Sequence, residues 1–227
     1  MTMSVCIKSL IKNRNIVIGC TNRCPYCYAR ISCARYRMTD DFSIPYFEES
    51  KLRLFDSKKP GTFLLTGMSD FADWKADWNQ KIFERIAMNP QHDFLFLTKS
   101  PERIHFESSL PNVWMGVTVT GSADKIRIRQ LKENIKVGHY HVTFEPLHTS
   151  VGELDLHGID WIVIGTETGK RRNKIDAKIE WVEEIVQQAQ ALHVPIFMKE
   201  ELAKVIGEEG MIQEMPPQFA GIGRFEK

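Results

Sequence analysis

Three cysteines lie close together near the start of the chain, at Cys20, Cys24 and Cys27 in the segment GCTNRCPYCYAR. Thiolates at this Cys-x3-Cys-x2-Cys spacing are ligands for zinc or for iron–sulfur clusters. Structural zinc normally takes four ligands in two separated pairs, and no second cysteine pair follows, while the 7 histidines are scattered singly. Three thiolates without a fourth suit instead an iron–sulfur cube, in which one of the irons stays open for another ligand.

The other two cysteines, Cys6 and Cys33, are expected to be small buried apolar residues. An odd total of 5 cysteines in a chain without export features favours a metal or redox site over a disulfide framework. The segment Met1 to Lys12 lacks a signal-peptide pattern, and no apolar run approaches the roughly 18 residues of a membrane span. We therefore expect a cytoplasmic protein with no membrane segment.

The composition is that of an ordinary globular protein, with 43% hydrophobic and 26% charged residues. A chain of 227 residues predicts one domain over 1–227, with a core at about 10–200 and a C-terminal extension at 201–227. The net charge of +1 excludes neither a small-molecule substrate nor a polymer, because a local basic face can exist within a balanced total.

Seven short apolar runs predict strands. Their hydrophobic residues are mostly continuous, as in FLFLT and WIVIG, which favours parallel strands that are covered on both faces. The predicted strands are Asn15–Gly19, Thr62–Thr66, Asp93–Thr98, Val113–Thr120, Tyr140–Phe144, Trp161–Gly165 and Pro195–Met198.

Helices are predicted between these strands. Apolar residues at helical spacing indicate helices over Asp77–Met88 and Ile179–Leu192, and a shorter one after Ser122. Alternating strands and helices imply an α/β fold with a parallel sheet and right-handed crossovers. Six or seven such units predict a partial (β/α)6-7 TIM-like barrel, because a full barrel takes about 250 residues; a doubly wound open sheet is the alternative.

Both architectures place ligand chemistry at the carboxyl ends of the strands. Glu145 ends an apolar strand, where an ionised carboxylate needs a partner, and Lys99 is placed to pair with an anion. Gly165 would allow a ligand to approach the backbone closely. The positions that this rule selects are Cys20, Thr66 to Asp70, Thr98, Lys99, Thr118 to Gly121, Glu145, Gly165 to Glu167, Lys199 and Glu200.

The cysteine loop resembles that of the radical S-adenosylmethionine (radical SAM) enzymes, which also carry an aromatic residue, here Tyr26, before the last cysteine. Six later segments look like the phage- and mobile-element-associated branch of that superfamily, and the GC…C.YCYA opening also resembles spore photoproduct lyase. The resemblance covers about residues 10–200. Those segments are TGMSDF, FLTKSPERI, LPNVWMGVTV, FEPL, WIVIGTETG and VPIFMKE.

The resemblance implies a [4Fe–4S] cluster on Cys20, Cys24 and Cys27 whose open iron binds S-adenosyl-L-methionine. Reductive cleavage would give methionine and a 5′-deoxyadenosyl radical that abstracts hydrogen from a substrate. An external electron donor of the flavodoxin or ferredoxin type is implied as a partner. The residues expected around S-adenosyl-L-methionine are Tyr26, Ser69, Asp70, Thr98, Lys99, Thr118, Glu145, Gly165 and Glu167.

The chain departs from the superfamily pattern in its second strand, where Thr66 to Asp70 replaces the usual Gly-Gly-Glu element. No second cysteine cluster follows, which argues against auxiliary clusters. Tyr28 and Cys33 are candidate hydrogen-atom relays, because phenol O–H and thiol S–H bonds are weak enough to exchange with carbon radicals. Trp74 and Trp78 are expected to pack or to form a lid.

The substrate is left open between a small molecule and a nucleic acid. The basic segment GKRRNK, residues 169–174, follows a strand on the active-site side and could contact phosphates, although such runs are usually solvated loops. Arg30, Arg35 and Arg37 form a second basic set. The alternatives are a repair or modification enzyme acting on nucleic acid, a non-catalytic iron–sulfur protein, and a nucleic-acid-binding module with a structural metal.

Overall fold

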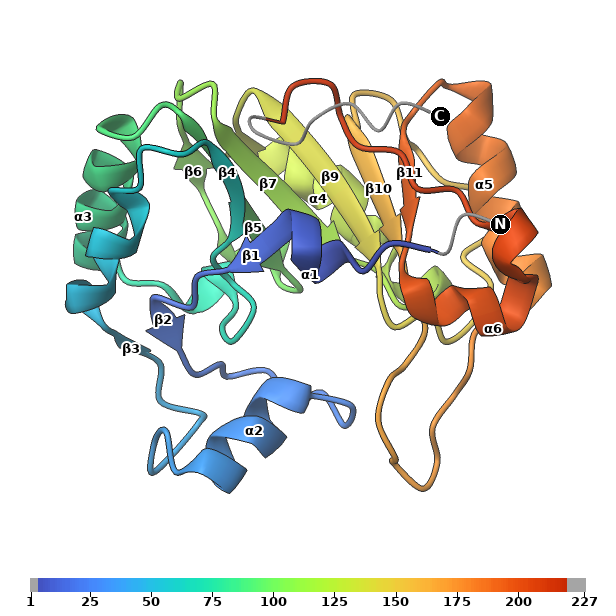
Figure 1. Ribbon diagram of the computed structural model, residues 1–227, viewed down its shortest axis with the longest axis horizontal. Coiled ribbons are helices and arrows are strands. Elements are labelled where there is room, and N and C mark those ends of the chain that lie inside the picture. Colours follow the sequence, from blue (N-terminus) through green and yellow to red (C-terminus); the bar gives the residue numbers. More distant parts are fainter. Residues whose placement is uncertain (1–3, 220–227) are drawn as a thin grey trace.

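The computed structural model describes residues 4–219, and its centre is a curled sheet of seven parallel strands (Figure 1). The strands follow one another across the sheet in chain order, with no reversal. A doubly wound sheet reverses its strand order part-way, so this succession confirms the partial barrel and excludes the alternative. The strands are β1 (Ile11–Asn13), β4 (Gly61–Leu64), β5 (His92–Thr98), β7 (Val113–Thr118), β9 (His139–Phe144), β10 (Trp161–Ile164) and β11 (Ile196–Met198).

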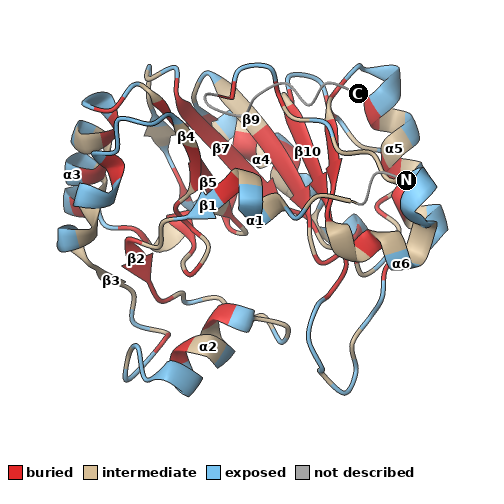
Figure 2. Cartoon of the chain, in the orientation of Figure 1, coloured by how far each residue is buried: buried red, intermediate tan, exposed pale blue. Residues whose placement is uncertain are grey.

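The predicted helices are confirmed as α3 (Ala76–Ala87), α4 (Ile126–Asn134) and α5 (Ile179–Ala191). Each buries one apolar stripe against the outer face of the sheet, as Ile82 does in α3 and Ile185 in α5. Trp74 and Trp78 are buried in this outer core, which fits the packing expectation. Figure 2 shows that most of the length of the central strands β5, β7, β9 and β10 is buried.

The first strand was predicted at the wrong place. The apolar segment Asn15–Gly19 leaves the main sheet, and β1 forms instead just before it, with Asn13 paired to Leu64. Within the segment, β2 (Val17–Ile18) pairs antiparallel with β3 (Tyr46–Phe47). Ile16, Val17 and Ile18 are all buried, so the apolar pattern correctly indicated burial but could not identify the pairing partner.

The remaining elements are short. They connect the main strands or cover the ends of the sheet, and β6 pairs in parallel with β8. They are α1 (Ile7–Leu10), α2 (Tyr28–Tyr36), β6 (Phe106–Glu107), β8 (Ile135–Lys136) and α6 (Ala203–Ile206). Within residues 4–219, no helix combines the length and the apolar character that crossing a bilayer demands.

The N-terminal segment spans the gap between the two edge strands of the half-barrel, β1 and β11. The Gln213 side chain accepts a hydrogen bond from Val5 N (2.7 Å) and donates to Val5 O (2.9 Å) and Met198 O (2.9 Å). From there the chain continues through α1 into β1, crossing in front of the sheet in Figure 1. Two segments far apart in sequence therefore tie the open edges together.

The C-terminal extension closes the end of the barrel interior at the start of the strands. Phe219 packs on Trp114 and Trp161, with ring centroids 4.6 Å and 5.2 Å apart, and Trp161 Nε1 donates to Glu214 O (3.1 Å). Both tryptophans lie near the amino ends of their strands. The interior is thus covered at this end, while the last part of the predicted extension, residues 220–227, lies outside the described residues.

Gly116 makes room for a neighbouring side chain in the centre of the sheet. A Cβ at this position would lie 2.5 Å from the ring of His141, which is its partner on β9. We expect Gly116→Ala to lower the free energy of unfolding by about 1–3 kcal/mol, because the buried imidazole has to shift. Gly138→Ala is the control, since its Cβ would meet no atom within 4 Å. Equal urea denaturation midpoints for the two variants would contradict this account of the packing.

Candidate functional site

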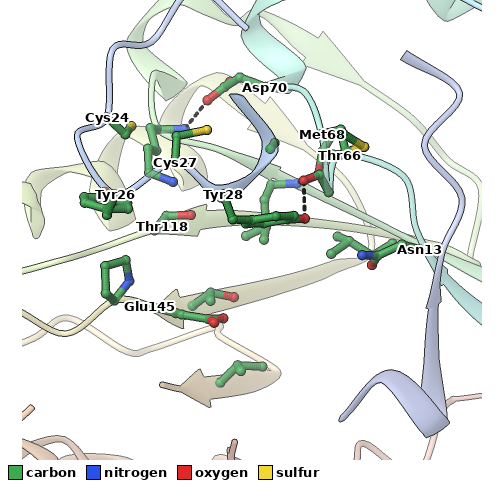
Figure 3. A pocket seen from close by; sticks show the side chains of 18 of the residues that line it. Asn13, Cys24, Tyr26, Cys27, Tyr28, Thr66, Met68, Asp70, Thr118 and Glu145 are labelled. Atoms are coloured by element: carbon green, nitrogen blue, oxygen red, sulfur yellow. Dashed lines mark hydrogen bonds between the residues drawn. The ribbon is translucent and has the colours of Figure 1, made fainter. Parts of the chain in front are cut away.

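The carboxyl ends of the strands open into a cavity of about 450 Å³. Its floor comes from the inner face of the sheet, including Leu95, His141, Thr143 and Val163, and the cysteine loop lies across it. Figure 3 shows Cys24, Tyr26, Cys27 and Tyr28 facing Thr118 and Glu145 from the strands. The strand-end rule therefore located the cavity correctly.

The cysteine loop is fixed to the segment that follows β4. Gly19 N donates to Met68 O (3.0 Å), and Thr21 N and Oγ1 donate to the Asp73 carboxylate (2.7 and 2.8 Å). Gly19 has a φ of +109°, and a Cβ there would lie 2.7 Å from Pro45 Cα, so only glycine fits. The loop thus begins at a backbone position that only glycine can occupy.

Helix α2 begins at the last cysteine of the loop. Cys27 is its N-cap, and the Cys27 Sγ accepts a hydrogen bond from Arg30 N (3.4 Å). The Arg30 guanidinium donates to Cys20 O (3.4 Å) and Asn22 O (3.0 Å), and it lies over the Phe42 ring at 5.0 Å. Arg30 therefore braces the loop from inside the helix that follows it.

The three thiols line the cavity, and none of them forms a disulfide. Burial, with the nearby Asp70 charge adding to it, raises the pKa of Cys20 to about 12, so this thiol is protonated at neutral pH. Across residues 4–219, no three His, Cys, Asp or Glu side chains are grouped so that they could hold a metal ion. The three thiols are therefore not preassembled around one ion.

Asp70 is the hydrogen-bonding centre of the site. Its buried carboxylate accepts from Asn22 Nδ2 (2.8 Å), Ala72 N (3.0 Å), Thr98 Oγ1 (2.5 Å) and Lys99 N (2.8 Å). These donors come from the cysteine loop, the segment after β4 and the end of β5. The carboxylate therefore holds three segments together, and Ser69 is likewise engaged, since its Oγ accepts from Trp74 Nε1 (3.1 Å).

A second charged pair lies at the far wall of the cavity. Lys199 Nζ donates to the carboxylate of Glu145, at the ends of β11 and β9. Burial disfavours the ammonium form, but the charge and hydrogen bond of Glu145, together with the charges of Glu201 and Glu200, outweigh it, so the pKa of Lys199 is raised and the side chain stays charged. A Cβ on Gly165 would lie 3.0 Å from Glu145 and 3.1 Å from Lys199, so this glycine makes room for the pair. Gly165 itself is not among the residues that line the cavity.

A third charged group joins the cysteine loop to the basic segment 169–174. Glu167 accepts two hydrogen bonds from the Arg171 guanidinium (2.7 and 2.8 Å) and lies 3.0 Å from His148 Nε2. The Arg171 bonds are the main reason that the pKa of Glu167 falls to about 2. The His148 ring meets the edge of Tyr26 at 5.1 Å. Glu167 thus connects Tyr26, through His148, to the loop after β10.

Comparison with known proteins assigns the chain to a family. Residues 7–208 match the family described as "Protein of unknown function (DUF5131)". The chain belongs to this family. No curated protein matches the sequence.

The DUF5131 protein shares its fold with spore photoproduct lyase. A solved structure of a spore photoproduct lyase mutant superposes with a TM-score of 0.52 and 8% sequence identity, covering 82% of this chain and 75% of that chain. At this identity the likeness concerns the fold alone. None of the matches bears on the phage- and mobile-element-associated branch, which stays a prediction.

The two candidate hydrogen-atom relays of the DUF5131 protein differ in position. Tyr28 lines the cavity, and its hydroxyl donates to Gly67 O (2.5 Å). Cys33 is buried beside Phe42 and Ile18 and is not among the lining residues. The expectation that Cys6 is buried was wrong, because Cys6 is exposed; burial of Cys33 is confirmed.

Sequence reasoning missed two histidines of the site. His148 follows β9 and reaches Glu167, but a lone histidine in a loop carries no signal of that contact. His141 lies in the cavity floor with its Nε2 3.0 Å from Phe96 O. Because a carbonyl only accepts, Nε2 carries the proton, and burial lowers the pKa of His141 to about 4. This imidazole is therefore neutral at pH 7.

The Glu167 ion pair predicts a pH-dependent contribution to stability. Its pKa of about 2 lies below the value of about 4.3 in an unfolded chain, so the stabilisation is present above about pH 4–5 and is lost as the pH falls toward 2. We expect Glu167→Gln to lower the free energy of unfolding by about 1–2 kcal/mol at pH 7 and by clearly less at pH 3.

Urea denaturation at both pH values measures this difference. Glu183→Gln is the matched control, because Glu183 is exposed on α5 and its carboxylate has no ion pair within residues 4–219. A Glu167→Gln effect that is the same at pH 3 and pH 7 would contradict the assigned pKa.

Proposed function

We propose that this DUF5131 protein is a radical SAM enzyme in which Cys20, Cys24 and Cys27 hold a [4Fe–4S] cluster. The observation that carries the proposal is the placement of these thiols. All three come from one loop, none forms a disulfide, and all line a cavity at the carboxyl edge of a half-barrel. The sequence resemblance to radical SAM enzymes and the fold shared with spore photoproduct lyase support it.

The donor set fits a cluster better than a single ion. The thiols are not grouped around one point within the described residues, and in a cube each thiolate binds a different iron. Because the pKa of Cys20 is raised, this thiol carries a proton at neutral pH. Binding of iron would release that proton, since a thiol binds a metal as its thiolate. The Arg30 N–H group already donates to the Cys27 sulfur and holds it at the start of α2.

When bound, the cluster supplies the electron that splits S-adenosyl-L-methionine into methionine and a 5′-deoxyadenosyl radical, which takes a hydrogen atom from the substrate. The protein's part is to bind and orient the reactants. Lys99 Nζ lies over the Tyr26 ring at 5.9 Å and has no ion pair within residues 4–219, so it can pair with a carboxylate of either reactant. Glu145, although paired with Lys199, has a carboxylate in the cavity for an ammonium or ribose hydroxyl.

The barrel shields the reactants from one side. Phe219 and the tryptophans it contacts cover the end opposite the cysteine loop, so a substrate reaches the cavity on the cysteine side. Excluding water from the covered end of the barrel would protect the proposed 5′-deoxyadenosyl radical from side reactions. We infer that an external donor of the flavodoxin or ferredoxin type supplies the electron, and that a reducing cytoplasm keeps the thiols free.

Anaerobic reconstitution with iron and sulfide tests the proposal. We expect about four irons and four sulfides per chain, with 5′-deoxyadenosine released slowly from S-adenosyl-L-methionine under dithionite. Cys24→Ala should lose both the iron and 5′-deoxyadenosine, because a cube with two protein thiolates is poorly held. Cys6→Ala should keep both, since Cys6 is outside the cavity lining.

Three outcomes would contradict the proposal. Stoichiometric zinc in place of iron would favour a structural metal, and full 5′-deoxyadenosine formation by Cys24→Ala would exclude that cysteine as a ligand. A four-iron cluster that never cleaves S-adenosyl-L-methionine under any reductant would indicate a non-catalytic iron–sulfur protein instead.

A further inference from the structure

Five exposed cations around the cysteine side of the cavity form what we name the basic rim: Arg23, Arg35, Arg37, Lys170 and Arg172. Within residues 4–219, none of the five makes an ion pair with a carboxylate. Other exposed cations in the described part of the chain, such as Lys8, Lys58 and Lys59, also lack an ion pair, so what distinguishes the rim is that its cations gather on two neighbouring segments at the cysteine side. The rim thus carries positive charge that the protein itself leaves unbalanced.

The two parts of the rim are physically connected. Arg23 belongs to the cysteine loop, Arg35 to α2 and Arg37 to the C-cap of that helix, whereas Lys170 and Arg172 belong to the loop between β10 and α5. Figure 1 shows both segments projecting from the same side of the sheet. The contacts from Tyr26 through His148 and Glu167 to Arg171 join the bases of the two segments.

Helix α2 also exposes aromatic rings among these cations. Tyr36 is 69% exposed, and Tyr28 is 55% exposed. The Tyr28 hydroxyl is held by Gly67 O, so its ring is fixed where it lines the cavity. The helix buries only Ala29 and Cys33, and its surface is largely exposed in Figure 2. Exposed aromatic rings between arginines are a stacking surface for unpaired bases.

We propose that the basic rim and the two tyrosines bind single-stranded nucleic acid. Phosphates contact the rim, and one base stacks on Tyr28 at the cavity, where it reaches the reacting atoms; this last point rests on the proposed radical SAM function. A duplex keeps its bases stacked inside and cannot use the tyrosine rings. An acidic protein would match the charge of α2 but gives no reason for a fixed ring beside the cavity.

Fluorescence anisotropy with a labelled 20-nucleotide single strand, as DNA and as RNA, tests the binding. The full-length protein should bind either strand more tightly than the duplex of the same sequence, with affinity falling steeply between about 50 and 200 mM salt. The double variants Arg35→Gln/Arg37→Gln and Lys170→Gln/Arg172→Gln should each weaken binding several-fold at 100 mM salt and flatten the salt dependence. Tyr36→Ala should cost about fivefold or more.

Two matched controls are needed. One shows whether the loss of any exposed charge weakens binding, and the other shows whether binding persists when the chemistry is lost. Lys58→Gln/Lys59→Gln removes two exposed cations just before β4, at the amino end of the strand and away from the carboxyl ends, and should bind as the unmodified chain does. Cys24→Ala should bind the single strand normally while forming no 5′-deoxyadenosine. Loss of chemistry with retained binding, or the converse, therefore shows which of the two proposals has failed.

Several results would overturn the proposal. These are no binding of either single strand at 50 mM salt, equal affinity for single strand and duplex, or unchanged affinity in both rim double variants. Preferential binding of an acidic flavodoxin, lost in the same double variants, would assign the surface to the electron donor instead.

Discussion

The buried carboxylate of Asp70 is the contact on which the rest of the site depends. It accepts hydrogen bonds from the cysteine loop, from the segment after β4 and from the end of β5. A buried carboxylate without such donors would be costly, so the fold and the loop stabilise each other through one group. Thr98 and Lys99 fix the Asp70 carboxylate at the end of β5, and this carboxylate in turn accepts a hydrogen bond from Asn22 in the cysteine loop. The hydrogen bond to Asn22 therefore helps to position the thiols of that loop.

The second constraint is the incomplete barrel. Seven strands leave β1 and β11 as edges, and the chain covers this gap with its own N-terminal segment and Gln213. Phe219 covers the interior at the amino ends of the strands. What stays open is the side of the cysteine loop, which lies beside the basic rim. A half-barrel thus leaves the cavity open on the cysteine side, where the proposed substrate would enter.

Most of the architecture could be predicted because buried parallel strands are continuous apolar runs. The helix Asp77–Met88 and the strand Asp93–Thr98 were located to within a residue or so for this reason. The first strand failed because Ile16 to Ile18 satisfy burial equally well against β3 as within the main sheet. The role of a residue was harder to predict than its place in the fold. Asp70 was selected as a ligand-binding residue, but its carboxylate already accepts from four donors of the protein.

By itself, the sequence determined the three thiols, their spacing and their place after a strand, because ligand chemistry is a property of residue type and short separation. It also indicated parallel strands, and hence the carboxyl edge as the place for a ligand cavity, but it left the strand order open between a partial barrel and a doubly wound sheet. Only the tertiary structure decided which charges are balanced. Glu167 pairs with Arg171 and His148, and Glu145 pairs with Lys199. The cations of the basic rim pair with no carboxylate within residues 4–219. The contacts of Glu145 with Lys199 and of Glu167 with His148 join residues that are 54 and 19 positions apart, and a strand-by-strand pattern carries no information about them.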